Sequence, residues 1–254
     1  MSNWTALAET LQTAYENGEP IDPDSLPAGL RIEDGYAIQD AIVDRRSRTG
    51  GPVVGYKIGF TNETVQSDLG VAEPVYGRIL EATVGSDGRV ERGELIDPLI
   101  EPEIVFVLDR ALSPPVTRLD VAAATRFVVP AIEIVDSRIE DWAFGAAEAV
   151  ADNALAARLH VGDPTPVGTS DLALEGVEVR IADDRRATGT GGAVLGHPAD
   201  AVCWLAEALD ARGDALDAGD IVTTGSITEP LPLESGETVV ARFSSLGTVA
   251  VHAG

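Results

Sequence analysis

Lysine, cysteine and aromatic residues are all scarce in this sequence, and each scarcity narrows what the chain can be. Of the 18 basic residues, 17 are arginine and one is lysine, Lys57. The single cysteine, Cys203, cannot form a disulfide within the chain, which fits a reducing compartment. Aromatic residues make up only 5% of the chain, so aliphatic side chains must fill the core.

Positive charge and long apolar runs are lacking as well. The 42 acidic residues give a net charge of −24, which repels nucleic acid and anionic lipid. No apolar run approaches membrane-spanning length, and the N-terminus has no signal-peptide pattern. The sequence therefore predicts a cytoplasmic protein with neither nucleic-acid nor membrane partners. Because the acidic residues are spread along the chain, we interpret the charge as adaptation to high salt.

The hydrophobic pattern predicts a small helical N-terminal annex at residues 1–52 and a catalytic domain at residues 53–254. The annex contains helices expected at 3–17 and 32–48. Beyond residue 53 the pattern changes to strands, expected at 53–58, 77–81, 103–109, 126–135, 177–182, 220–224, 238–243 and 247–252, with helices at 145–160 and 198–212. The fold class is α+β with a mixed β-sheet core.

Three glutamates stand in apolar surroundings, where a carboxylate is costly. Glu101 and Glu103 flank Pro102, and residues two apart on a strand point to the same face. Taken alone, this pair fits a solvated strand entrance slightly better than a site. Glu133 stands inside an apolar run, where a carboxylate must be paired, protonated or bound to metal. An arginine such as Arg138 is the structural alternative.

Together, three carboxylates from two strands would suit Mg²⁺ or Mn²⁺. Zinc is not expected, because the three histidines have no ligand-like spacing. Lys57 lies in a weakly polar run, where it can bind an anionic substrate, move a proton or neutralise the glutamates. Hydroxyl residues around Gly225, at 223–228, can hold a carboxylate or form a plain turn.

Several stretches together resemble the 2-keto-4-pentenoate hydratase and 4-oxalocrotonate decarboxylase family, within the fumarylacetoacetase superfamily. The matching stretches are residues 55–61, 69–77, 100–104, 130–139, 150–154, 201–205, 216–226 and 246–249. The Glu-x-Glu motif and the run from Pro130 to Arg138 are the specific ones. The resemblance covers nearly the full chain.

This resemblance implies a mixed-β fold with a helical N-terminal part, a homo-oligomer, and a Mg²⁺ or Mn²⁺ ion held by Glu101, Glu103 and Glu133. It also places Lys57 in the active site. The residues that we expect to contact the substrate lie within or beside the matching stretches, and they are Thr61, Tyr76, Asp136 and Ser226.

Two residues depart from the family pattern. Val75 stands where hydratases of the family usually have an aspartate that is proposed to transfer protons, whereas decarboxylases often have an apolar residue there. Glu73 is the candidate that could replace this acid. Leu155 stands where the family often has a serine, which puts one polar substrate contact in doubt.

The chemistry implied is that of a 2-oxo acid substrate whose dienolate is stabilised by the metal. We predict a hydro-lyase of aromatic meta-cleavage catabolism that adds water to a 2-hydroxy-2,4-dienoate of the 2-oxopent-4-enoate type, giving a 4-hydroxy-2-oxo acid. The alternative is a carboxy-lyase acting on a 2-oxo-3-enedioate such as 4-oxalocrotonate. A fumarylpyruvate-type hydrolase would need an early histidine, yet none precedes His160. A cation-binding domain without catalysis is the remaining alternative.

Overall fold

The computed structural model describes residues 3–168 and 171–254. The helices are α1 (Asn3–Asn17), α2 (Ile32–Gly50), α3 (Glu63–Asp68), α4 (Arg118–Ala124), α5 (Ala146–Ala151) and α6 (Pro198–Asp210). Strands of the larger sheet are β1 (Val53–Gly59), β2 (Val75–Leu80), β3 (Val84–Gly85), β5 (Leu99–Leu108), β6 (Thr125–Val135), β7 (Ala156–Val161), β8 (Thr165–Pro166), β11 (Ile221–Thr223) and β12 (Leu231–Pro232). The smaller sheet contains β4 (Arg89–Val90), β9 (Gly176–Ile181), β10 (Asp184–Thr190), β13 (Thr238–Phe243) and β14 (Gly247–Ala253).

Within the described residues, these strands form a nine-stranded and a five-stranded sheet. The larger sheet runs β2-β1-β11-β5-β6-β7-β3, with β12 paired to β5 and β8 paired to β6. The smaller sheet runs β10-β9-β13-β14-β4. Parallel and antiparallel pairs both occur, so the predicted α+β class with mixed sheets is confirmed. No helix in the described part of the chain is long and apolar enough to cross a bilayer.

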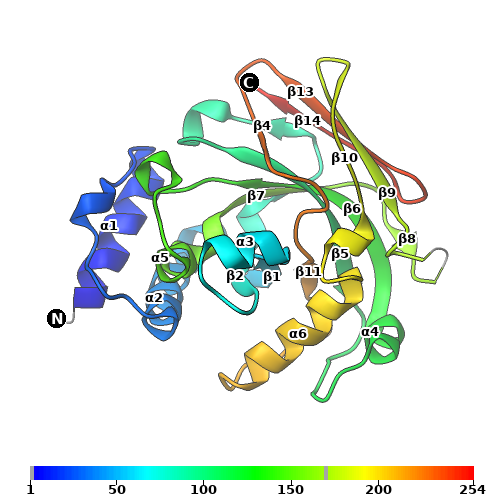
Figure 1. The fold of residues 1–254 in the computed structure, drawn as a ribbon, viewed down its shortest axis with the longest axis horizontal. Coiled ribbons are helices and arrows are strands. Elements are labelled where there is room, and N and C mark those ends of the chain that lie inside the picture. The colour runs from blue at the N-terminus through cyan, green and yellow to red at the C-terminus, as the bar shows by residue number, and fades with distance from the viewer. Residues whose placement is uncertain (1–2, 169–170) are drawn as a thin grey trace.

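The N-terminal helices have a small apolar core of their own. Leu7 and Leu11 of α1 pack with Ile38 and Ile42 of α2. Figure 1 shows α1, α2 and α5 together at one end of the molecule, away from the smaller sheet. The boundary expected near residue 52 falls between α2 and β1. The division into two domains stays a prediction, because Ala151 of α5 also joins this core.

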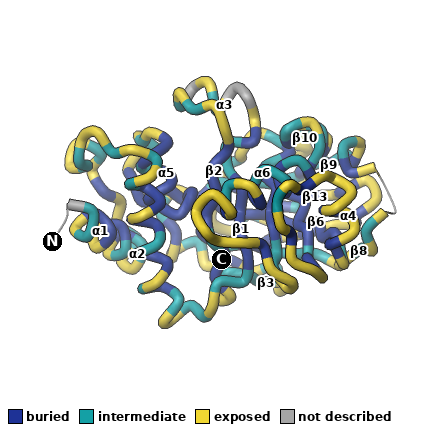
Figure 2. Tube along the Cα trace, turned by 90° about the horizontal axis from the view of Figure 1, so that it is seen from below, coloured by how far each residue is buried: buried dark blue, intermediate teal, exposed yellow. Residues whose placement is uncertain are grey.

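The main core joins both sheets and α6. It contains Ile104 and Phe106 of β5, Leu205 of α6, and Val239 and Val251 of the smaller sheet, all almost fully buried. Figure 2 shows that the buried parts of the trace run through the strands, while the connecting loops are exposed. Burying each large aliphatic side chain stabilises the fold by about 1.5–3 kcal/mol. This core occupies the face of β5 that carries the even-numbered residues.

The pairing of β5 with β6 sets the opposite face. Glu101 lies directly across from Glu133, and Leu99 lies across from Val135. Because directly opposed residues share a face, the two glutamates point to the same side of the sheet. The strand expected at 103–109 begins earlier, at Leu99, so Glu101 and Glu103 both lie inside it. We call the face that carries these glutamates the site face.

The helix expected at 145–160 is wrong beyond Ala151. The chain turns at residues 152–155 and continues as β7, which pairs with β6. Asn153, Ala154 and Leu155 have φ angles of 53°, 50° and 65°, which no right-handed helix contains. Tertiary contacts of this turn with β2 override the helical pattern. The helices α3 and α4 and the strands β3, β4, β8, β10 and β12 also have no counterpart among the elements expected from the sequence.

Candidate metal centre

The three predicted glutamates meet at one point on the site face. Each offers a carboxylate oxygen, and these oxygens lie within 4.8 Å of one another. Glu103 and Glu133 are buried and Glu101 is half-buried. Glu103 Oε2 accepts a hydrogen bond from Gly225 N–H at 2.9 Å. Glu103 Oε1 and Glu133 Oε2 are buried without a hydrogen-bond donor, so the cluster fits a hard cation that takes oxygen ligands.

The charges of the cluster support the same conclusion. Burial, followed by the negative charge of Glu133, raises the pKa of Glu101 to about 7. Burial and both neighbouring carboxylates raise the pKa of Glu103 well above its usual range. Burial alone would lower the pKa of Lys57, but the three carboxylates outweigh it and raise that pKa. One ammonium against three carboxylates leaves a surplus of buried negative charge, which a divalent cation would neutralise.

Lys57 reaches the cluster from β1. Its ammonium donates a hydrogen bond to the carbonyl of Ala154 at 2.9 Å and lies 3.4 Å from Glu133 Oε2. The side chain is 3% exposed, so both contacts are shielded from water. Thr223 of β11 is the direct neighbour of Lys57 in the sheet, and its buried hydroxyl has no hydrogen-bond partner. Two polar groups beside the glutamates are therefore oriented toward the site face.

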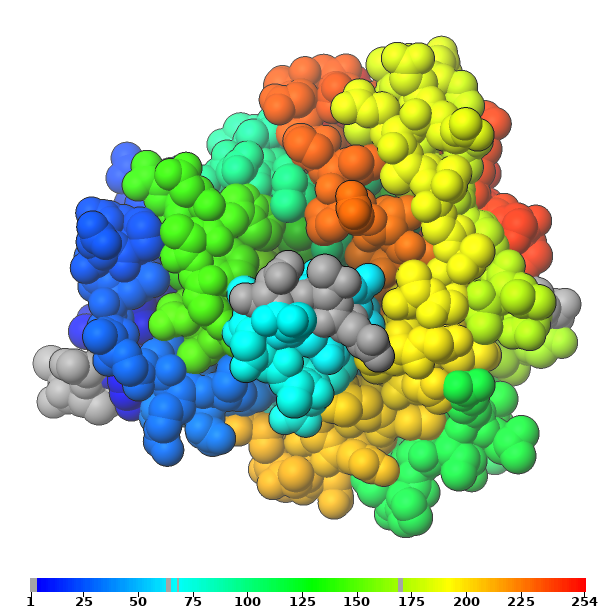
Figure 3. All heavy atoms as spheres, in the orientation of Figure 1, coloured from blue at the N-terminus to red at the C-terminus, as the bar shows by residue number. Residues whose placement is uncertain are grey.

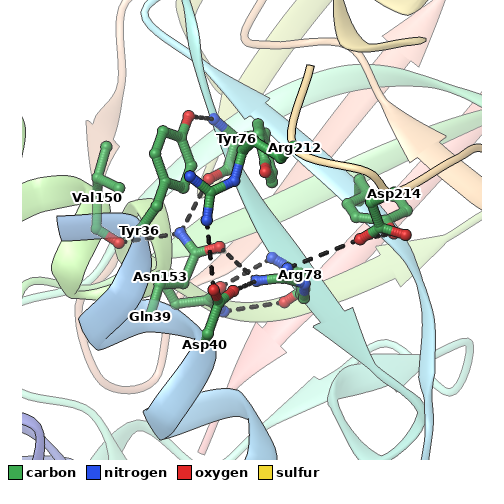
Figure 4. A network of polar contacts seen from close by, with 10 residues as sticks. Tyr36, Gln39, Asp40, Tyr76, Arg78, Val150, Asn153, Arg212 and Asp214 are labelled. Atoms are coloured by element: carbon green, nitrogen blue, oxygen red, sulfur yellow. Dashed lines mark hydrogen bonds and ion pairs between the residues drawn. The ribbon is translucent and has the colours of Figure 1, made fainter. Parts of the chain in front are cut away.

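The left-handed turn at residues 152–155 places the carbonyl that holds Lys57. The Asn153 side chain accepts from Arg78 N–H at 2.8 Å and donates to the Arg78 carbonyl at 2.9 Å, so it pairs with the outer edge of β2. Figure 4 shows this pairing within a wider polar network. A Cβ on Gly77, which lies opposite Lys57, would come within 2.3 Å of the Asn153 carbonyl. Glycine at this position allows the turn to approach.

Thr61 lies beside the same cluster. It is buried, and a Cβ on Gly225 would come within 2.2 Å of its hydroxyl oxygen. Gly225 has φ +104°, and its N–H binds Glu103, so glycine is required there both by conformation and by space. Ser226 follows Gly225 and donates its hydroxyl proton to the Thr228 carbonyl at 2.7 Å. Thr61 thus packs against Gly225, and Ser226 follows Gly225 in the chain. Both predicted substrate residues therefore lie next to the residue whose N–H binds Glu103.

Two other predicted substrate residues point elsewhere. Tyr76 points to the other face of the sheet from Lys57, where its ring stacks on Tyr36 with ring centres 4.6 Å apart. The buried carboxylate of Asp136 accepts the backbone N–H groups of Ile96 and Asp97, at 2.9 and 2.8 Å. That carboxylate holds the approach to β5. The structure therefore gives both residues packing or anchoring roles instead of a place among the glutamates.

Val75, the departure from the hydratase pattern, does face the site. It pairs with Gly59, and the point where a Cβ on Gly59 would lie is 3.6 Å from Val75 Cγ2 and 3.8 Å from Lys57 Nζ. An apolar side chain thus lies on the same face as the ammonium, diagonally across the β1–β2 pair. Glu73, the expected substitute acid, is exposed before the start of β2.

Sequence reasoning missed the carbonyl of Ala154 as part of the site. The stretch around Ala154 matched the family, but the direction of a carbonyl depends on a turn that the sequence pattern does not predict. Thr223 was included only in the hydroxyl run that can hold a carboxylate or form a plain turn, and its position beside Lys57 comes from the pairing of β1 with β11.

Converging carboxylates beside a buried lysine on a bent mixed sheet define a divalent-cation enzyme site. The model of the family described as "Fumarylacetoacetate (FAA) hydrolase C-terminal" matches residues 61–252. The chain belongs to the fumarylacetoacetate hydrolase family, and it is an enzyme of that family.

Curated relatives divide between two reactions. A 2-keto-4-pentenoate hydratase of Burkholderia vietnamiensis is 37% identical over 96% of this chain and 95% of its own. A 4-oxalocrotonate decarboxylase of Pseudomonas sp. (strain CF600) is 36% identical over 97% of this chain and 95% of its own. The solved 4-oxalocrotonate decarboxylase of Pseudomonas putida G7, complexed with magnesium and adipate, has a TM-score of 0.94 and 34% identity, covering 99% of this chain and 97% of its own. The family resemblance predicted from the sequence is confirmed.

Proposed function

We propose that the chain is a divalent-cation-dependent carboxy-lyase that releases carbon dioxide from a 2-oxo-3-enedioate of the 4-oxalocrotonate type. Hydration of a 2-hydroxy-2,4-dienoate, favoured by the names of most curated relatives, is the second candidate reaction. The observation that favours decarboxylation over hydration is the apolar Val75, which lies near Lys57 on the site face. The relatives alone do not rank the two reactions, because both kinds are 36–37% identical to this chain.

Glu101, Glu103 and Glu133 would hold Mg²⁺ or Mn²⁺, since they offer converging oxygens and a surplus of negative charge. Magnesium in the solved decarboxylase relative supports this assignment. When bound, such a cation supplies Lewis-acid polarisation of the substrate's 2-oxo group. Because Glu103 is also fixed by Gly225 N–H, at least one ligand is held in place before any cation arrives.

Lys57 would act on the substrate itself. When the bond between C5 and C6 of the enedioate breaks, carbon dioxide leaves and the electron pair moves through the conjugated chain onto the 2-oxygen. The ammonium, fixed by the Ala154 carbonyl, can neutralise this developing charge and then donate a proton to the dienolate, which solvent replaces. Arginine could supply the charge but not the proton.

Hydration makes one further demand on the protein. A proton must reach the far end of the dienoate and water must be directed to the neighbouring double bond. Val75 can transfer no proton, and the exposed Glu73 lies outside β2. Carbon dioxide release needs neither group, so the described site supports decarboxylation better than hydration.

Product analysis on two substrates tests the order. With Mg²⁺ present, the protein should release carbon dioxide from 2-oxohex-3-enedioate with a larger kcat/KM than it hydrates 2-hydroxypenta-2,4-dienoate. Faster hydration would reverse the assignment. Lys57→Arg should keep Mg²⁺ affinity but lower kcat at least about 100-fold, since it removes the transferable proton. Near-full turnover in Lys57→Arg would reduce Lys57 to a structural counter-ion.

We further propose that the enzyme is a homo-oligomer that works in a cytoplasm of high salt. The high-salt assignment is supported by the net charge of −24 and the almost complete replacement of lysine by arginine, and the homo-oligomer is what the family resemblance implies. Screening of crowded carboxylates should raise the melting temperature in molar KCl relative to dilute buffer. An equal or lower melting temperature in KCl contradicts the salt assignment, and size measurement in the same buffers tests the oligomer.

A further inference from the structure

A cluster of apolar side chains adjoins the metal centre along the site face. Its buried members are Val135, Ala149 and Leu155, and its half-buried members are Phe60, Leu99, Trp142 and Phe144. We call these seven residues the distal cluster. The Leu99–Val135 pair follows the Glu101–Glu133 pair by one register step on the same face. One such step of two residues is about 7 Å, close to the length of a short 2-oxo acid.

The distal cluster also borders the site from two other elements. Leu155 directly follows Ala154, whose carbonyl holds the Lys57 ammonium. Phe60 follows the last residue of β1, the strand that carries Lys57. The cluster therefore approaches the reacting groups from β1, from the β5–β6 pair and from the turn at residues 152–155.

Three of its members have an unusual backbone conformation. Phe60, Trp142 and Leu155 have φ angles of 59°, 56° and 65°, in the left-handed region that side chains of this size rarely adopt. Such conformations cost about 1–3 kcal/mol each and gather where the fold holds a side chain for a function. Simple core packing would not require all three on the border of one site.

The cluster is also partly open to solvent. Phe60, Leu99, Trp142 and Phe144 are each half-buried. Figure 3 shows the surface hollowed between the green segment near residues 140–150 and the orange segment near 225–235. This hollow leaves room for a small molecule beside the segment that contributes Trp142 and Phe144.

The charges on the segment that contributes Trp142 and Phe144 are acidic. Residues 139–148 contain Glu140, Asp141 and Glu148 and no basic residue, and Arg138, directly before them, is buried and paired with Asp152. The Trp142 indole N–H donates to the Asp97 carboxylate at 3.0 Å. A second substrate carboxylate would therefore meet hydrocarbon and negative charge in this direction.

We propose that the distal cluster is the subsite for the end of the substrate farthest from its 2-oxo acid group, that it recognises this end as hydrocarbon, and that Leu155 is its specificity-determining residue. The inference rests on the proposed function. Such a subsite would also favour the proposed reaction. A carboxylate held against apolar side chains loses its hydration, whereas the neutral carbon dioxide formed from it does not require hydration. Leu155 is the buried member of the cluster that directly follows Ala154, whose carbonyl holds the Lys57 ammonium.

Binding of unreactive ligands tests the subsite without turnover. The full-length protein loaded with Mg²⁺ is titrated calorimetrically with pyruvate, 2-oxobutanoate, 2-oxopentanoate and 2-oxohexanedioate. Affinity should rise about three- to fourfold with each added methylene. The diacid should bind no more tightly than 2-oxopentanoate. Equal affinity along the monoacid series, or clearly tighter binding of the diacid, overturns the inference.

Two variants at one position locate the effect. Leu155→Ser should flatten the dependence on chain length while pyruvate affinity stays unchanged, which shows that the metal centre is intact. Leu155→Met, of similar volume and apolarity, should keep the dependence. On the enedioate, Leu155→Ser should lower kcat without raising KM, since a better hydrated carboxylate is less reactive. If Leu155→Ser keeps the full chain-length dependence, Leu155 is not the specificity residue.

The two proposals fail separately. If the native protein releases no carbon dioxide but shows the chain-length dependence, the reaction is wrong and the hydrocarbon subsite stands. If it releases carbon dioxide but binds all monoacids equally, the reaction stands and the subsite is wrong.

Discussion

Two buried groups of like charge lie on either side of the turn at residues 152–155, and the fold resolves them in opposite ways. One is the cluster of three glutamates beside Lys57. The other gathers three arginines around Tyr15. The Arg46 guanidinium lies 3.7 Å from the Tyr15 ring centre, and Arg158 donates to the Tyr15 hydroxyl at 3.2 Å. The third, Arg138, pairs with Asp152.

The arginine group finds its partners inside the chain. Arg138 binds Asp152 through its backbone N–H, Nε and Nη2, at 2.6–3.0 Å. Only its Nη1 lacks a hydrogen bond, and the guanidinium lies 5.9 Å from the Tyr15 ring centre. Among the glutamates, Glu103 Oε1 has no hydrogen-bond donor, and Glu133 Oε2 has only the Lys57 ammonium, 3.4 Å away. Three carboxylates thus share one buried cation, and a charge group left unbalanced in this way marks a ligand site.

The largest expected effect is the loss of Mg²⁺ binding when one of the three glutamates is changed. Glu133→Gln keeps the shape but removes one ligand charge, so Mg²⁺ affinity should fall more than about 100-fold and Mg²⁺-dependent turnover with it. Calorimetric titration with Mg²⁺ measures this directly. Glu207→Gln, an exposed residue of α6, is the matched control and should change neither quantity. Unaltered Mg²⁺ affinity in Glu133→Gln would remove Glu133 from the ligand set.

The second effect concerns the stability of the fold, which should depend on the arginine group and not on the glutamates. Arg138→Met leaves Asp152 buried and unpaired, so the free energy of unfolding should fall by about 3–5 kcal/mol. Glu101→Gln, measured without metal, should leave the stability unchanged or raise it, because it relieves repulsion within an incomplete cluster. Urea unfolding in EDTA at fixed salt compares both variants with the native chain. A comparable loss of stability in both variants would erase the distinction.

A smaller effect appears in the pH dependence without metal. Because folding raises the pKa of Glu101 to about 7 and that of Glu103 well above its usual range, the folded state binds more protons than the unfolded chain in this range. Metal-free stability should therefore rise as the pH falls from 8 to 6. We expect a gain of about 1–2 kcal/mol, reduced by screening at the half-buried Glu101. The Glu101→Gln/Glu103→Gln double variant should show a shallower slope, and an unchanged slope would contradict this origin.

The smallest effect concerns the turn that joins the two groups. Asn153→Ala removes both side-chain bonds to Arg78, so stability should fall by about 1–2 kcal/mol. Because Ala154 then positions Lys57 less well, kcat should fall several-fold more than Mg²⁺ affinity. Asn17→Ala, at the exposed end of α1, is the control. Loss of stability without any loss of kcat would show that the turn does not position the lysine.

Convergence of the glutamates could be predicted from the sequence, because a two-residue spacing in β5 and an acid within the apolar run of β6 each have a physical signature. The isolation of Lys57 in composition was a comparable signal. The position of Tyr76 could not be predicted from the sequence, since the strand expected at 77–81 began one residue after it. The bonds of Asp136 to Ile96 and Asp97 depend on segments 39–40 residues apart. The left-handed turn at Leu155 contains no glycine to indicate it.

The outer edge of β2 has one more consequence. As the last strand of its sheet, β2 would ordinarily present open backbone groups to any passing strand. Tyr36 accepts the N–H of Tyr76, Gln39 donates to the Tyr76 carbonyl, and Asn153 pairs with both backbone groups of Arg78. Side chains thus take the places of a neighbouring strand. A second polypeptide therefore cannot extend the sheet at Tyr76 and Arg78 of this edge, and aggregation by strand addition is blocked here.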